Sequence, residues 1–181
     1  MPRGANRAAI VARTGVLAAL IGSTGCSLIL DFDQPADAAP PDAPVTMAQC
    51  SANEPNDTPA TATAWAGLDV DAAICGNGDV DLYAVGLVAN QPIRATITFM
   101  NRNGAGDLDL RLLTGDGGMV LDESKTSADT ETVLCPGGAP CPTITGGTYL
   151  IEVKGFTAGV QSAYLLHIDT SGDADAGIDA M

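Results

Sequence analysis

The sequence contains few basic residues. Of 181 residues, 8 are Lys or Arg and 22 are Asp or Glu. Arg3, Arg7 and Arg13 lie at the N-terminus, which leaves five basic residues against 22 acidic ones, a net charge of −17, for the rest of the chain. Binding to nucleic acid or to anionic lipid depends on clustered Lys and Arg that contact phosphates. The composition therefore excludes nucleic acid and electrostatic membrane binding as functions.

Catalytic motifs are also missing. His167 is the only imidazole, and no Gly-x-Ser-x-Gly accompanies it. Gly104-Ala105-Gly106 lacks the strand-to-helix setting of a phosphate-binding loop. A hydrolase that works with a pair of carboxylates stays open as an alternative, because an acidic β-sheet protein offers many candidate pairs. We expect that the protein is not an enzyme.

No apolar run is long enough to cross a bilayer as a helix, but the N-terminus has the features of an export signal. A basic stretch precedes the apolar residues 15–21 and the small residues 22–25, which predicts a signal peptide over residues 1–25. Ser23-Thr24-Gly25-Cys26 resembles the lipobox at which bacterial lipoproteins are cleaved and then lipidated on the cysteine, although Ser23 stands where Leu is usual. The alternative is ordinary signal-peptidase cleavage at the same bond, which would give a secreted protein. Ser27 implies sorting to the outer membrane in a host with two membranes.

Lipidation of Cys26 would leave an even number of cysteines, which favours disulfides in an exported chain. These four residues are Cys50, Cys75, Cys135 and Cys141. Of the three possible pairings we favour Cys135 with Cys141, because residues 136–140 between them contain Pro and Gly, which form turns that bring the two ends together. Cys50 then pairs with Cys75. A zinc site is the alternative, but one His and no Cys-x-x-Cys speak against it.

Two stretches lack apolar periodicity. Residues 26–49 are rich in Pro, Ala and Asp and predict a disordered tether, and residues 171–181 predict a disordered Asp- and Ala-rich tail. Between them, residues 50–170 alternate short β-rich runs with Gly, Asn and Asp breaks. We expect an all-β domain, a two-sheet antiparallel β-sandwich of jelly-roll-like form with about eight strands. The expected strands are residues 64–74, 81–87, 93–100, 108–113, 119–123, 130–134, 148–153 and 163–168.

Alternation within the expected strands predicts which residues face the core. Ile93 and Ile97 share one face of their strand, with Ala95 and Phe99. The same pattern makes His167 a plain strand residue and sends Asp109 outward, to solvent, from a strand whose leucines face inward.

Five motifs follow one another across this region. They are Glu54-Pro55-Asn56-Asp57, Gly78-Asp79-Val80-Asp81-Leu82-Tyr83, Asp107-Leu108-Asp109-Leu110-Arg111-Leu112, Gly147-Thr148-Tyr149-Leu150-Ile151-Glu152-Val153 and Tyr164-Leu165-Leu166. In this order they resemble the bacterial pre-peptidase C-terminal domain family, which includes the collagen-binding modules of collagenases. The resemblance covers roughly residues 53–169. It implies a β-sandwich that assists secretion, stability or attachment and performs no catalysis.

The resemblance also implies a calcium site, where the segment that leads into the domain meets an early strand. Carried over to this sequence, the ligands are Glu54, Asn56 and Asp57 from the segment and Asp79 and Asp81 from the strand. Calcium takes about six to eight oxygen ligands, and two such clusters brought together could supply most of them. Asp79 and Asp81 stand two apart, so on a strand their side chains share a face.

One position departs from the collagen-binding relatives, which carry a further acidic residue two positions before the Glu, where this chain has Ala52. The alternative to a metal site is that residues 54–57 form a plain turn and that Asp79 and Asp81 are solvated at a strand edge. On balance the sequence predicts a cell-envelope lipoprotein, held to the membrane by its lipid, that displays a calcium-stabilised module. The expected partner is an extracellular protein or polysaccharide. The alternative is an accessory protein that supports an envelope partner or a secreted peptidase.

Overall fold

The computed structural model describes residues 45–136, 141 and 143–172. The predicted signal peptide, Cys26, residues 27–44 of the predicted tether and residues 173–181 of the predicted tail lie outside these residues. The described part contains one short helix and nine strands. They are α1 (Met47–Ser51), β1 (Thr63–Ala64), β2 (Val70–Cys75), β3 (Val80–Leu87), β4 (Ile93–Phe99), β5 (Leu108–Thr114), β6 (Val120–Ser124), β7 (Thr130–Cys135), β8 (Gly147–Gly155) and β9 (Gln161–Asp169).

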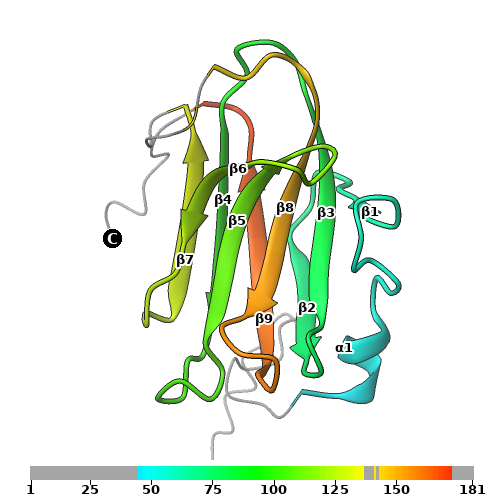
Figure 1. The fold of residues 1–181 in the computed structure, drawn as a ribbon, viewed down its shortest axis with the longest axis vertical. Helices are drawn as coiled ribbons and strands as arrows, with labels where there is room; N and C mark the ends of the chain where they lie inside the picture. The colour runs from blue at the N-terminus through cyan, green and yellow to red at the C-terminus, as the bar shows by residue number, and fades with distance from the viewer. Residues whose placement is uncertain (1–44, 137–140, 142, 173–181) are drawn as a thin grey trace, which may run out of the picture. The chain divides into compact units, whose positions relative to one another are not determined.

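The strands form two sheets that face each other (Figure 1). One sheet has the order β1-β3-β8-β5-β6 and the other β2-β9-β4-β7. All neighbouring strands are antiparallel except β1 and β3, which pair in parallel over two residues. Without β1, the two sheets have the strand orders β3-β8-β5-β6 and β2-β9-β4-β7, which is the arrangement of a jelly roll. The predicted all-β sandwich is thus confirmed.

The predicted strand over residues 64–74 is wrong. The chain pairs with β3 at Ala64, then leaves that sheet and joins the other as β2 from Val70 onward. The break falls at Gly67, whose φ of 82° lies in the left-handed region that favours glycine. A continuous run of β-compatible residues therefore serves two sheets.

The helix α1 covers the last residues that the sequence assigned to the tether. Thr46 caps it: the Thr46 hydroxyl accepts a hydrogen bond from the Gln49 N–H at 3.2 Å, and Gln49 Oε1 accepts one from the Thr46 N–H at 3.0 Å. Such a reciprocal capping box stabilises the first turn. With only five residues, the helix is too short to be stable alone, and its Cys50 is tied to β2.

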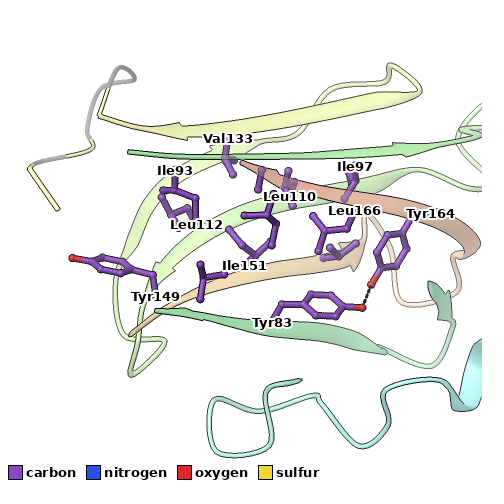
Figure 2. Packing of buried hydrophobic residues seen from close by; sticks show 14 of the residues in the cluster. Tyr83, Ile93, Ile97, Leu110, Leu112, Val133, Tyr149, Ile151, Tyr164 and Leu166 are labelled. Carbon is purple, nitrogen blue, oxygen red and sulfur yellow. Dashed lines mark hydrogen bonds between the residues drawn. The ribbon is translucent and has the colours of Figure 1, made fainter. Parts of the chain in front are cut away.

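The main core lies between the two sheets and follows the predicted alternation. Figure 2 shows inward side chains of both sheets interleaved, among them Ile97, Leu110, Ile151 and Leu166. In β4 every second residue from Ile93 is buried. Burying such a side chain contributes about 2 kcal/mol relative to leaving it in water, so this alternation holds the sheets together.

A second, smaller cluster lies on the outer face of the five-stranded sheet. Leu82, Leu113 and Leu150 are buried there, under residues 53–69, which we call the strap. Pro59 of the strap reaches the turn between β5 and β6, where a Cβ on Gly117 would come within 2.9 Å of Pro59 Cγ. The strap therefore covers apolar surface that the sandwich would otherwise expose.

The expectation that Asp109 on β5 is exposed to solvent is wrong. It points outward, away from the leucines, but it is only 5% exposed. Burial raises the pKa of Asp109, and the charge of Lys154, its neighbour on β8, opposes the rise. The alternation predicted its direction correctly but not its burial, which depends on the neighbouring strand.

Both predicted disulfides are present. Cys50 and Cys75 are joined with their Cα atoms 5.7 Å apart, and Cys135 and Cys141 with theirs 5.6 Å apart. Disulfides persist in oxidising surroundings, which indicates an extracellular or periplasmic location. No helix within the described residues has the length and apolar composition needed to span a bilayer.

Candidate metal centre

The first arm of the predicted calcium site runs along the edge of β3. Asn56 accepts a hydrogen bond at its carbonyl from the Leu82 N–H, at 3.2 Å. Asp57 accepts one at Oδ1 from the Val80 N–H, at 3.3 Å. Glu54 in turn accepts one at Oε2 from the Asn56 N–H, at 3.0 Å. Residues 54–57 are thus fixed against the strand instead of forming an isolated turn.

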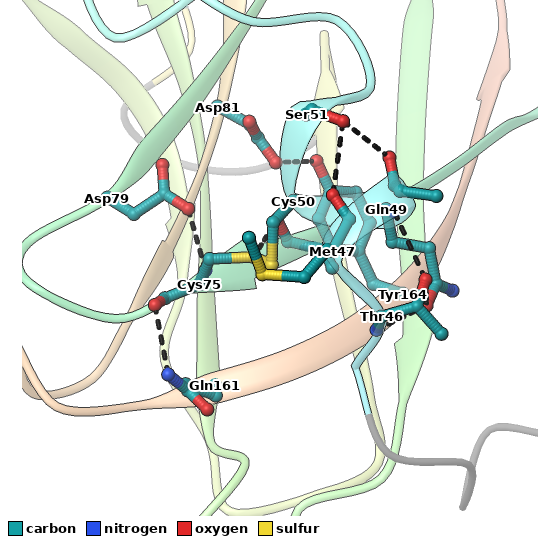
Figure 3. The surroundings of a disulfide bond; sticks show 12 residues. Thr46, Met47, Gln49, Cys50, Ser51, Cys75, Asp79, Asp81, Gln161 and Tyr164 are labelled. Carbon is teal, nitrogen blue, oxygen red and sulfur yellow. Dashed lines mark hydrogen bonds between the residues drawn. A yellow bond between two sulfur atoms is a disulfide. The ribbon is translucent and has the colours of Figure 1, made fainter.

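The second arm is the tight turn that joins β2 to β3. Gly76, Asn77 and Gly78 all have positive φ, and the Asp79 N–H closes the turn on the Gly76 carbonyl at 3.1 Å. Asp79 Oδ2 accepts a hydrogen bond from the Cys75 N–H at 2.6 Å (Figure 3). This contact fixes the carboxylate beside the disulfide.

The two arms bring three carboxylates together. Glu54, Asp57 and Asp79 each offer an oxygen, and these oxygens all lie within 4.8 Å of one another. Partial burial raises the pKa of Glu54, and the charges of Asp79 and Asp57 raise it further, while the hydrogen bond from the Asn56 N–H opposes the rise. Like charges at such distances repel unless a cation lies between them.

Asn56 is the predicted ligand with a neutral, amide oxygen. Its side chain is fully buried, and among the described residues neither its Oδ1 nor its Nδ2 makes a hydrogen bond of good geometry, although the amide lies near enough to Asp81 to lower the pKa of that carboxyl. Leaving a buried amide unpaired costs about 1–3 kcal/mol. The amide therefore keeps hydrogen-bonding capacity near Asp81, in the same segment as Glu54 and Asp57.

Asp81 is more buried than the other three predicted carboxylates. It is 2% exposed, and its Oδ2 accepts a hydrogen bond from the Tyr164 hydroxyl, which Figure 3 shows between the two side chains. Burial raises the pKa of Asp81 to about 6, against the effect of Tyr164 and of the nearby Asn56 amide. The alternative of a solvated strand-edge residue is wrong for Asp81. Nor does it join the three carboxylates that lie within 4.8 Å.

Two tyrosines behind Asp81 were not expected to take part. The Tyr83 and Tyr164 hydroxyl oxygens lie 2.7 Å apart inside the core, as Figure 2 shows. Burial raises the pKa of both phenols, so they stay neutral. A signal was present in the sequence: alternation turns Asp81 and Tyr83 to the same inner face, and a buried hydroxyl needs a partner.

His167 lies elsewhere, on the outer face of the four-stranded sheet. Its Nδ1 is 2.7 Å from Asp69 Oδ1, and both side chains are more than half exposed. The prediction that His167 is a strand residue is confirmed.

The chain was compared with known proteins and solved structures. No protein-family model matches it, and no curated protein matches it in sequence. Among solved structures, it resembles the pre-peptidase C-terminal domain of a collagenase from Bacillus anthracis, with 15% identity, a TM-score of 0.45 and coverage of 60% of this chain and 94% of that one. That domain represents the family which the motif order resembles.

Two further structures are similar at the same level. The Aeromonas hydrophila periplasmic inhibitor of g-type lysozyme, PliG, has 14% identity and a TM-score of 0.41, with coverage of 56% of this chain and 83% of that one. The Yersinia pseudotuberculosis-derived mitogen has 16% identity and a TM-score of 0.42, with coverage of 61% and 90%. Similarities this low identify no function.

Proposed function

We propose that the domain binds one calcium ion and is the non-catalytic module of an exported lipoprotein. The observation that carries the proposal is the convergence of Glu54, Asp57 and Asp79, together with the fully buried amide of Asn56 in the same segment as Glu54 and Asp57. Asp81 lies on the inner side of this group, where it accepts a hydrogen bond from Tyr164. Three carboxylates and one amide oxygen offer the all-oxygen ligands that calcium prefers.

The donor set favours calcium over other common metals. Zinc prefers nitrogen and sulfur ligands, whereas Cys50 and Cys75 are joined to each other and His167 pairs with Asp69. Magnesium demands near-ideal octahedral geometry and keeps several waters. Donors from two separate chain segments suit the larger and less demanding ion.

Calcium bound here would fasten the strap to the sandwich. Glu54 and Asp57 belong to the strap, whereas Asp79 and Asp81 belong to the β2–β3 turn and β3. The ion would thus hold the cover over Leu82, Leu113 and Leu150. Its role in this proposal is structural.

The same proposal places the domain at the cell surface as a binding module. The two disulfides support an exported location, and the predicted lipid on Cys26 would hold the domain at the membrane, where outer-membrane sorting is expected. Its partner would be an extracellular protein or polysaccharide.

Calorimetric titration of the metal-free protein with calcium chloride tests the proposal. We expect one site per chain, Asp79→Asn lowering the affinity at least about tenfold, and Asp71→Asn leaving it unchanged. Asp71 is a suitable control because it is exposed on β2. The absence of calcium binding, or equal affinities in all three proteins, would reject the metal site.

A further inference from the structure

A polar hollow of about 660 Å³ opens at the opposite end of β4 from the Cys135–Cys141 disulfide. The loop between β4 and β5 and the turn between β6 and β7 form it, and Figure 1 shows both at the lower end of the sandwich. Its lining residues are Met100, Asn101, Arg102, Asn103, Gly104, Asp107, Ser127 and Asp129. Seven of the eight are polar, charged or glycine, so the hollow does not suit an apolar ligand.

Asn101 makes the hollow rigid. It is 6% exposed, and its Nδ2 donates to Asp107 Oδ1 at 3.1 Å and to the Ser127 carbonyl at 3.0 Å. Its backbone N–H donates to Asp129 Oδ1 at 2.8 Å, and its Oδ1 accepts from the Gly104 N–H. One buried residue thus joins the two loops and orients both carboxylates, Asp107 through its side chain and Asp129 through its backbone N–H, so a ligand would not have to order them.

The lining combines acceptors and donors. Asp107 and Asp129 accept hydrogen bonds, whereas the side chains of Arg102 and Asn103 carry N–H donors. The two carboxylates and the net negative charge of the chain repel anions. A neutral ligand with many hydroxyl groups can donate to the carboxylates and accept from the N–H groups at the same time.

An exposed aromatic ring lies on the segment bonded to this hollow. Phe156, in the turn between β8 and β9, is 64% exposed, and its N–H donates to the Asp107 carbonyl at 2.9 Å. The apolar surface of such a ring stays in contact with water, which is unfavourable, unless a ligand covers it. The C–H face of a pyranose is apolar, while its edge carries hydroxyl groups. A saccharide therefore offers an apolar face to an aromatic ring and hydroxyl groups to the polar lining.

We propose that this hollow, with the exposed Phe156 on the adjoining turn, is a binding site for a neutral saccharide. The inference rests on the proposed role as a binding module and names the site and the ligand class. It does not depend on calcium, because none of the predicted calcium ligands lines the hollow.

Amide chemical-shift titration of the intact protein tests the site. The probes are maltohexaose, cellohexaose, xylohexaose and chitohexaose, each to about 10 mM, which detects even weak binding. We expect at least one probe to shift the amides of Asn101, Asp107, Ser127 and Asp129. Phe156→Ala should weaken that binding at least about fivefold, whereas Met119→Ala, an exposed residue of another turn, should not.

Three outcomes would overturn the inference: no shifts with any probe, shifts confined to another surface, or equal binding by Phe156→Ala. Shifts of these amides by calcium chloride or a lysine-rich peptide, with none by the sugars, would also overturn it. Sedimentation with insoluble polymers distinguishes failure of the saccharide site from failure of the proposed role as a binding module. Binding to gelatin alone would reject the saccharide site and retain the module, whereas binding to neither gelatin nor insoluble glycans would reject both.

Discussion

The Cys50–Cys75 disulfide joins the chain four residues before Glu54 on one side and four residues before Asp79 on the other. Each arm of the candidate metal centre therefore begins at the same covalent link. The Cys75 N–H also donates to Asp79 Oδ2, so the bridge fixes a ligand as well as a segment. In this arrangement the disulfide should order the site before the ion binds.

The first prediction is that the double variant Cys50→Ser/Cys75→Ser loses about tenfold in calcium affinity and about 3 kcal/mol in stability, the latter from the 25-residue separation of the cysteines. Calorimetry and urea unfolding measure the two effects. Cys135→Ser/Cys141→Ser is the matched control and should keep its calcium affinity. Equal calcium affinities in both double variants would show that the bridge does not order the site.

The second prediction concerns the strap. Removing calcium should speed hydrogen exchange at the Leu82 and Val80 amides, because their acceptors are the Asn56 carbonyl and Asp57 Oδ1. The amides of Ile97 and Leu112, within the core strands, should keep their protection. Uniform acceleration at all four amides would mean instead that calcium acts on the whole fold.

The third prediction follows from the unpartnered amide of Asn56. Asn56→Ala should lower calcium affinity at least about tenfold but change the stability of the metal-free protein by only about 1 kcal/mol, since among the described residues the side chain makes no hydrogen bond of good geometry. Asn56→Asp keeps an oxygen ligand and should retain calcium binding. In the metal-free state it should be less stable, because it buries a second carboxylate beside Asp81. A large loss of metal-free stability in Asn56→Ala would show that the amide already has a partner.

The fourth prediction uses the pKa of Asp81, which burial raises from 3.8 to about 6 in the folded protein. The folded state then holds the proton more tightly than the unfolded state, so Asp81 lowers metal-free stability as pH rises between these two values. The loss is on the order of 2 to 3 kcal/mol. Asp81→Asn removes this term, so at pH 7 it should be more stable than the wild type, with the difference vanishing near pH 4. Urea unfolding at several pH values measures it, and a difference that does not change with pH would contradict the assignment.

The fifth prediction concerns the anchor. If Cys26 is lipidated, the protein should partition into detergent and incorporate a fatty-acid analogue, and Cys26→Ser should lose both properties. Wild-type protein found entirely free of membrane would instead support ordinary signal-peptide cleavage.

Local pattern was sufficient for much of the fold. The alternation from Ile93 to Phe99 predicted a half-buried strand, and the Pro- and Gly-rich residues between Cys135 and Cys141 predicted their bridge. Both depend on neighbours in the chain, where side-chain direction and turn geometry follow from residue type. The run from Ala64 to Ile74 was wrongly predicted as one strand, because residues of this kind can pair in either sheet.

The sequence by itself determined the strand faces, the cysteine pairs and the acidic residues available to a cation. It could not determine which acids share a space, because that depends on contacts between residues distant in the chain. Tertiary structure brought Glu54 and Asp57 beside Asp79. It also turned Asp81 toward Tyr164, 83 residues away. Burial follows from what the neighbouring strand and the strap cover, and only the packed sheets decide that.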